Sequence, residues 1–297
     1  MDRTVKHALI MPNMLVGADA PKIVDYAIAA EEAGWDGFFP FDILVNPCPG
    51  ADQGQAGDPE GGWNPDTYED FIDPWIALAG IATRTERITL GTWITPLARR
   101  QPWQVARDIA TVDRLSNGRV MFGTGLGRRP DYEKFGIPWD SKAIGQRYDE
   151  ALEIISRFWS GERVTYNGEH FAIDDVAVLP TPQQRPRPPI LIAGYWPNKK
   201  PFRRGARWDG IMPMFGAGAD SGRSPEESVR EMLTWYHDFA DDPGDIFMPY
   251  SARGASDEYV DLCTELGTTW FYTAPTREWL EDIEGRIREG PPVRVAR

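Results

Sequence analysis

Cysteine and histidine are scarce in this chain, since its 297 residues contain two cysteines and three histidines. Two thiols do not make a disulfide framework, so Cys48 and Cys263 argue against the class of small disulfide-stapled secreted proteins. No Cys-x-x-Cys spacing occurs, and His7, His170 and His237 are scattered along the sequence. The sequence therefore predicts no metal site.

Positive charge and long apolar runs are lacking as well. The 45 acidic residues outnumber the 32 basic ones, and the net charge of −13 argues against nucleic acid as a partner, because phosphate binding needs a cationic surface. No run of about 18 apolar residues suggests a membrane span. The first residues, MDRTVKHALIMP, have too short an apolar core for a signal peptide. We therefore expect a cytoplasmic protein without a membrane partner.

What the chain does contain is a regular alternation of strand-like and helix-like segments. Apolar runs typical of strands are found at His7–Met11, Gly37–Pro40, Ile88–Thr92, Val120–Phe122, Ile190–Ala193, Gly210–Pro213, Ile246–Pro249 and Thr269–Tyr272. Helical periodicity lies between them, at Lys22–Ala33, Pro74–Thr83, Trp103–Leu115, Pro201–Arg207, Pro225–Ala240, Ser256–Leu266 and Glu278–Arg288.

Eight such strands predict a parallel sheet, and eight is the number that closes a (β/α)8 TIM barrel. We expect one barrel domain over residues 1–297. The rival architecture is an open doubly wound sheet. Its dinucleotide-binding motif, G-x-G-x-x-G, is matched at Gly123 and Gly125, but Arg128 stands at the third glycine position, so the motif gives that rival only weak support.

Two insertions interrupt the alternation. Asn46–Asp70 is rich in glycine and proline and predicts a long loop after the second strand. Asp140–Pro189 lies between the fourth and fifth strands and contains a predicted helix, Gln146–Trp159. It also contains the Asn167-Gly168 pair between two β-prone runs, which predicts a hairpin.

In a barrel the active site lies at the carboxyl ends of the strands. The candidate residues at these ends are Asp42, Thr92, Thr95, Thr124, Arg128, Arg129, Asp131, Gly194, Tyr195, Trp196 and Asn198. They contain no Ser-His-Asp set. Asp42 and Asp131 could serve as the two carboxylates of a barrel hydrolase. A pocket for a flat, phosphorylated cofactor fits this set of residues better, because such a cofactor supplies the reactive atoms itself.

Glycines and cations near two strand ends support that interpretation. Gly194 opens a turn into a short helix, whose free N–H groups can bind an anion, and Arg203 and Arg204 add positive charge there together with two lysines. Trp93 interrupts an aliphatic strand end, where it either packs in the core or forms a flat wall against a ring system.

The sequence resembles the luciferase-like flavin-dependent oxidoreductases over nearly its whole length. The resemblance is carried by EEAGWDGFFPFD (Glu31–Asp42), the long block from Asp73 to Gly127, and PPILIAGYWPNKKPFRRGARWDGIMP (Pro188–Pro213). The long block holds the Gly91-Thr92 strand end and the Asp113–Arg119 turn. This bacterial luciferase-like monooxygenase superfamily implies a barrel that uses FMN or the deazaflavin coenzyme F420.

The resemblance also implies roles for particular residues. A non-proline cis peptide near Thr92–Trp93 would back the flavin ring. Thr124 and Gly125 would line the ribityl chain or phosphate. The phosphate would be held by the Gly194 turn with Tyr195, Trp196 and Asn198, and Asp42 would lie beside the cofactor. The candidate catalytic residues are Asp42, Thr95 and Arg128.

At two positions the sequence departs from the pattern of one subgroup of this superfamily, and both departures bear on the kind of substrate. Deazaflavin-dependent sugar-phosphate dehydrogenases of the superfamily have a histidine where this chain has Ile43, and an acid where it has Arg128. The resemblance therefore does not imply a sugar-phosphate substrate.

We expect an FMN-dependent monooxygenase that acts on a small organic substrate, with reduced flavin supplied by a separate flavin reductase. The alternative within the family is hydride transfer with coenzyme F420. The alternatives outside it are the Asp42–Asp131 hydrolase and a non-catalytic flavin-binding protein. The family tends towards dimers, so we expect a homodimer.

Overall fold

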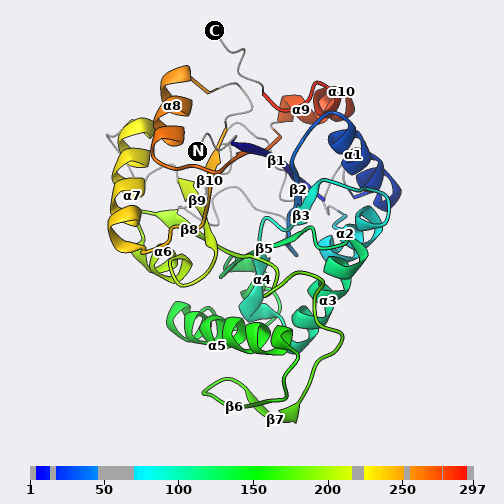
Figure 1. Cartoon of the computed structure of the whole chain (residues 1–297), viewed down its shortest axis with the longest axis vertical. Helices are drawn as coiled ribbons and strands as arrows, with labels where there is room; N and C mark the ends of the chain where they lie inside the picture. Colours follow the sequence, from blue (N-terminus) through cyan, green and yellow to red (C-terminus); the bar gives the residue numbers. More distant parts are fainter. Residues whose placement is uncertain are drawn as a thin grey trace.

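The described part of the protein forms a closed barrel of parallel strands surrounded by helices (Figure 1). The computed structural model describes residues 5–13, 18–45, 70–215, 224–250, 255–275 and 277–292. The barrel strands are β1 (Lys6–Met11), β2 (Gly37–Pro40), β3 (Thr89–Gly91) with β4 (Thr95–Pro96), β5 (Val120–Gly125), β8 (Ile190–Trp196), β9 (Gly210–Phe215), β10 (Asp245–Pro249) and β11 (Trp270–Thr273). Parallel pairing of β1 with both β2 and β11, and of β3 with β5, closes the sheet. The predicted (β/α)8 barrel is confirmed.

The third barrel position is shared by two short strands rather than by the continuous strand Ile88–Thr92. Leu90 of β3 pairs with Val120 of β5, and Thr95 of β4 pairs with Thr124 further along the same strand. Between them the chain has a non-proline cis peptide at Trp93–Ile94, one residue after the position expected from the resemblance.

The helices lie close to their predicted places. They are α1 (Ala20–Glu32), α2 (Pro74–Ala82), α3 (Pro102–Leu115), α4 (Pro130–Glu133), α5 (Ser141–Ser160), α6 (Lys199–Gly205), α7 (Pro225–Phe239), α8 (Asp257–Glu265), α9 (Arg277–Glu281) and α10 (Ile283–Arg288). The predicted helix Glu278–Arg288 is divided in two, because Asp282 leaves the helical conformation and caps α10 through Gly285 N. None of the described helices is long and apolar enough to cross a membrane.

The second insertion contains α5 and the predicted hairpin, formed by β6 (Val164–Asn167) and β7 (Ala172–Val176). The hairpin lies beyond α5 at the edge of the molecule (Figure 1). Asn167 pairs with Ala172, so the turn is longer than a two-residue Asn-Gly turn. The Glu150 carboxylate of α5 accepts backbone N–H groups from Glu169, His170 and Phe171 of this turn. The predicted loop Asn46–Asp70 lies outside the described residues, apart from Asp70.

Most of the Asp113–Arg119 turn serves the barrel framework. The Arg119 guanidinium donates hydrogen bonds to oxygens of Ala82, Thr85, Ile88 and Ser116. Buried Asp113 accepts the backbone N–H groups of Gln183 and Gln184, which precede β8. These contacts lie at the amino ends of β3, β5 and β8, opposite the carboxyl ends where a barrel carries its active site.

The glycines of β5 allow the interrupted third strand to pack closely against it. A Cβ on Gly123 would lie 2.2 Å from the Thr92 carbonyl oxygen and 2.9 Å from Met212 Sδ. A Cβ on Gly125 would meet Ile94 Cδ1 at 2.6 Å, which is the far end of a flexible side chain. The first glycine therefore has a fixed backbone neighbour, whereas the second has a neighbour that can move.

We therefore predict that Gly123→Ala destabilises the barrel much more than Gly125→Ala. The first change forces backbone or core atoms apart and should lower the free energy of unfolding by about 3 kcal/mol, whereas rotation of Ile94 should keep the second below about 1 kcal/mol. Urea unfolding followed by circular dichroism measures both. Equal losses in the two variants would contradict this account of the third strand.

Candidate functional site

Residues at the carboxyl ends of the strands divide into two sets, because successive side chains of a strand face opposite sides of the sheet. On β11, Trp270 and Tyr272 pack in the barrel interior, whereas Phe271 packs against the helices. Trp93, in the break between β3 and β4, belongs to the same interior cluster. The alternation predicts an inward side chain at Tyr195, two residues after the interior residue Ala193.

The upper layer of the barrel interior is apolar and aromatic. We use the name upper layer for Phe41, Trp93, Ile94, Met214 and Tyr272, which belong to one interior cluster. The Trp93 and Tyr272 rings lie 4.2 Å apart between centroids. Four of the five side chains are partly exposed, and Trp93 is 7% exposed. A flat ring system with apolar faces fits this surface, because aromatic and aliphatic side chains can pack against its plane.

The three threonines predicted for the site form a buried hydroxyl cluster. Thr92 Oγ1 lies 2.9 Å from Thr95 Oγ1 and donates to the Gly123 carbonyl. Thr124 Oγ1 donates to the Thr95 carbonyl, and Trp75 Nε1 donates to Thr95 Oγ1. All three threonines are fully buried. They therefore fix the backbone of β4 and β5, on which the upper layer rests.

The residues predicted to hold a phosphate near β8 have structural partners. A Cβ on Gly194 would lie 2.2 Å from Pro201 Cβ, so the glycine lets α6 approach the strand. Trp196 is buried in the outer cluster beside Phe202. Asn198 is exposed and caps α6 by accepting Lys200 N.

The two arginines of that region have partners of their own. Arg204 donates to both oxygens of Asp149 at 2.6 and 2.9 Å and lies over the Tyr148 ring. Arg203 lies over the Phe239 ring. A phosphate at Arg204 would have to compete with the Asp149 carboxylate. Phosphate binding by these arginines stays a prediction.

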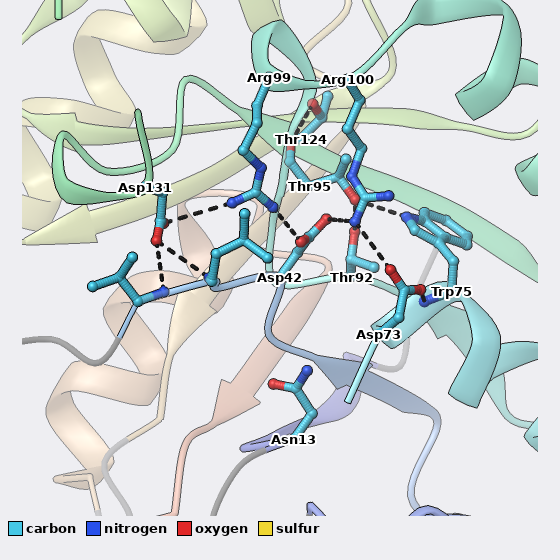
Figure 2. Close-up of polar contacts among 12 residues, drawn as sticks. Asn13, Asp42, Asp73, Trp75, Thr92, Thr95, Arg99, Arg100, Thr124 and Asp131 are labelled. Carbon is cyan, nitrogen blue, oxygen red and sulfur yellow. Dashed lines mark hydrogen bonds and ion pairs between the residues drawn. The ribbon is translucent and has the colours of Figure 1, made fainter. Parts of the chain in front are cut away.

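Asp42 belongs to a buried charge cluster that the sequence analysis did not anticipate. Arg99, which follows β4, donates to Asp42 Oδ1 at 2.6 Å, and Arg100 donates to Asp42 Oδ2 at 2.8 Å and to Asp73 at 3.4 Å. Figure 2 shows both arginines reaching Asp42 from the same segment. The signal in the sequence was the pair Arg99-Arg100, which follows Thr95-Pro96 after two apolar residues.

Asp131 lies on the other side of Arg99 (Figure 2). Its Oδ1 accepts the backbone N–H groups of Leu44 and Val45 at 3.2 and 3.0 Å. Arg128 donates to the Val45 carbonyl. Val45, which follows β2, is therefore bound through its N–H group to Asp131 and through its carbonyl group to Arg128. Burial raises the pKa of the Asp131 carboxyl, against the opposing effect of Arg128 and Arg99.

The chain is also held by hydrogen bonds where it returns to the barrel at Ile72. Asn13, which follows β1, donates its side-chain amide to the Ile72 carbonyl, and its own carbonyl accepts Ile72 N. The chain therefore leaves the barrel at Val45 and returns at Ile72 through hydrogen bonds to residues of the framework.

The arrangement disfavours the hydrolase hypothesis. Both Asp42 oxygens are paired with arginines, and one Asp131 oxygen is held by backbone amides. Two carboxylates that act as acid and base need contact with the substrate. Asp42 instead anchors Arg99 and Arg100. Thr95 and Arg128, the other candidate catalytic residues, donate or accept bonds within the protein.

Comparison with known proteins points to a single family. The family model described as luciferase-like monooxygenase matches residues 8–236. A relative, the F420-dependent glucose-6-phosphate dehydrogenase of Microbacterium testaceum, is 33% identical over 178 residues, which cover 59% of this chain and 47% of the relative. The chain spans about half the length of these curated relatives.

Two solved structures share the fold. The monooxygenase RslO1 from Streptomyces bottropensis has a TM-score of 0.63 and 23% identity over 96% of this chain and 83% of its own. An F420-dependent secondary alcohol dehydrogenase, solved with an F420-acetone adduct, has a TM-score of 0.71 and 14% identity over 95% of this chain and 98% of its own. At these identities the likeness concerns the fold alone.

The charge cluster gives a prediction for stability. Asp42→Asn would leave Arg99 and Arg100 with reduced compensation in a site where the Asp42 side chain is 2% exposed. We expect a loss of about 3 kcal/mol in the free energy of unfolding. The control is Asp175→Asn, whose ion pair with Arg163 is exposed on both sides, and there we expect no measurable loss. Losses of similar size in urea unfolding would show that the cluster does not stabilise the strand ends.

Proposed function

This chain belongs to the luciferase-like monooxygenase family, whose members are oxidoreductases, and we propose that it is a hydride-transferring oxidoreductase that uses coenzyme F420. The observation that carries this choice is the set of curated relatives that match at 30% identity or more, several of which are F420-dependent dehydrogenases. The sequence analysis put FMN and O₂ first and F420 second. The relatives favour the second.

The upper layer supports a cofactor with a flat ring. Trp93, Ile94 and Tyr272 offer the ring an aromatic and aliphatic surface at the place where β3 gives way to β4. The buried hydroxyl cluster of Thr92, Thr95 and Thr124 would hold that surface still. When bound, the deazaflavin ring supplies the carbon that accepts or gives the hydride. The protein's part would be to orient the ring and to keep water from one of its faces.

We also propose that the substrate differs from that of the glucose-6-phosphate dehydrogenases named above. Their glucose 6-phosphate carries a dianionic group, and recognition of such a group requires cations. Arg99, Arg100 and Arg204 are each paired with carboxylates. Ile43 stands where the sugar-phosphate dehydrogenases have a histidine. These features favour a small organic substrate without a phosphate.

FMN-dependent monooxygenation is the second candidate, because the monooxygenase RslO1 has the same fold. The two candidates differ in their partners. Oxygenation would need a source of reduced flavin, such as the separate reductase proposed from the sequence, whereas hydride transfer needs only the cofactor and the substrate. We retain the homodimer as a proposal.

Titration with both cofactors tests the proposed function. We expect oxidised F420 to bind with a dissociation constant near 1 µM, about −8 kcal/mol, and FMN to bind at least about tenfold more weakly. Quenching of tryptophan fluorescence and calorimetry measure both. Tighter binding of FMN would favour monooxygenation, and binding of neither cofactor would refute the family-based proposal for the cofactor.

A second prediction concerns the surface on which the ring rests. Trp93→Leu should weaken cofactor binding by about tenfold, because the variant loses the aromatic contact while keeping an apolar side chain. The matched control is Trp103→Leu on α3, which is 39% exposed and lies in the helix layer. Similar dissociation constants for the wild type and the Trp93 variant would place the ring elsewhere.

A further inference from the structure

The barrel interior contains a row of aromatic rings in sequence, one against the next. We use the name aromatic row for Trp93, Phe247 and Trp270, which belong to the interior cluster and are 7%, 0% and 2% exposed. The rings of Phe247 and Trp270 are stacked, with centroids 5.0 Å apart and planes 7° apart. The rings of Trp93 and Phe247 lie 6.4 Å apart between centroids. Both separations are those of aromatic rings that pack against each other.

The aromatic row runs from the amino end of the barrel to its carboxyl end. Trp270 is the first residue of β11 and pairs with Lys6, the first residue of β1. Phe247 pairs with Trp270 across β10 and β11. Trp93 lies in the break between β3 and β4 and belongs to the upper layer. The row therefore connects the upper layer with the opposite end of the barrel.

At the amino end the row approaches the surface of the protein. Lys6 is exposed, and its Nζ lies 4.9 Å from the centroid of the Trp270 ring. Trp270 itself is almost fully buried, so the exposed Lys6 side chain covers it as a single layer. One end of the row thus lies in the upper layer and the other lies just beneath the solvent.

The side chains of the row differ in how easily they lose an electron. Indole is among the most easily oxidised neutral side chains, whereas a phenyl ring resists oxidation and can only mediate transfer between two indoles. Tyr272 also contacts Trp93, at 4.2 Å between centroids. A phenol loses its proton on oxidation, and the Tyr272 hydroxyl donates to the Pro213 carbonyl, which is no base. Trp93 and Trp270 are therefore the electron donors of the row.

We propose that the aromatic row is an electron-transfer path that supplies single electrons to an oxidant at the upper layer and moves the resulting electron vacancy to the amino end of the barrel. This activity goes beyond hydride transfer, in which electrons move as a pair. It rests on the proposed function only in placing a flat ring against the upper layer. Such an oxidant arises there when light excites an oxidised flavin or deazaflavin, and the path returns the ring to its ground state before it damages the site.

The steps balance in electrons and need no change in bonding. Trp93 gives one electron to the excited ring, so the indole is oxidised and the ring is reduced by one electron. Trp270 then gives one electron to Trp93 through Phe247, and both indoles keep their N–H protons. The vacancy on Trp270 is filled when the electron returns from the ring. A soluble reductant such as ascorbate fills it instead by losing one electron and one proton, and the ring then keeps its electron.

Lys6 controls how far the vacancy travels. Its ammonium group makes the oxidised, positively charged form of Trp270 less favourable, because like charges repel at the short distance between them. Removing this charge should therefore keep the vacancy on Trp270 for longer. A row that served only as packing would respond to substitution of the buried rings and would be indifferent to the charge of Lys6.

The experiment excites the F420-loaded protein with a short flash, without oxygen, and follows oxidised tryptophan by its transient absorption. Trp93→Phe should lower the yield of oxidised tryptophan by at least about tenfold. Trp270→Phe should keep the initial yield and shorten the lifetime of the vacancy by at least about tenfold. Both substitutions keep an aromatic ring in place. The control is Trp103→Phe on α3, in the helix layer, which should change neither quantity.

Two further measurements test the role of the amino end. Lys6→Gln should lengthen the lifetime by about fourfold, the effect of one unit charge at 4.9 Å in water. Ascorbate should fill the vacancy in the wild type and leave the ring reduced. It should do so much less in Trp270→Phe, because the vacancy there stays at the other end of the row.

A tethered flavin makes the test independent of cofactor binding. Phe41→Cys places a thiol in the upper layer, where a maleimide flavin can be attached. Cys48→Ser in the same variant removes one native thiol, and Cys263 is buried. The flash measurement is then repeated with this protein and with the same substitutions of Trp93 and Trp270.

The results separate the path from the proposed function. Equal yields of oxidised tryptophan in the wild type and Trp93→Phe would overturn the path at its first step. Equal lifetimes in the wild type and Trp270→Phe would show that the vacancy never leaves Trp93 and that the row only packs the barrel. If neither F420 nor FMN binds while the tethered flavin gives the expected pattern, the proposed function fails and the path stands.

Discussion

A closed parallel barrel forces every strand to send alternate side chains inward and outward, and the candidate site depends on that constraint. On β11, Trp270 and Tyr272 face the interior, while Phe271 between them packs against the helices. Neighbouring residues in the sequence therefore serve different layers. The inward residues can meet a ligand at the strand ends, and the outward ones determine where the inward ones lie.

The strands, most of the helices and the hairpin could be predicted from the sequence because their signals are local. Apolar periodicity, caps such as Ser224 and the Asn167-Gly168 pair act within a few residues. The interruption between β3 and β4 could not be predicted in position, because it depends on how Gly123 accommodates the Thr92 carbonyl across the sheet. The resemblance implied a non-proline cis peptide near Thr92–Trp93, and the observed cis peptide is one residue later, at Trp93–Ile94.

The candidate site was predicted less well, for a related reason. Asp42 was identified, but its partners Arg99 and Arg100 are 57 and 58 residues away, and no pattern in one sequence pairs residues across that distance. Arg204 was assigned to a phosphate from its place beside a glycine turn, yet Asp149 on α5 is its observed partner. Part of the resemblance rests on residues that hold the framework together: Asp113 and Arg119 connect the amino ends of the strands, opposite the end where a barrel carries its active site.

The hydrogen bonds at Val45 and Ile72 have a consequence for how such a protein can diverge. Asp131 and Arg128 hold the chain where it leaves the barrel, and Asn13 holds it where it returns. The residues between these two anchors can change in number and identity during evolution without transmitting strain to β2 or α2. Exchanging that stretch should therefore leave the barrel beneath the anchors folded.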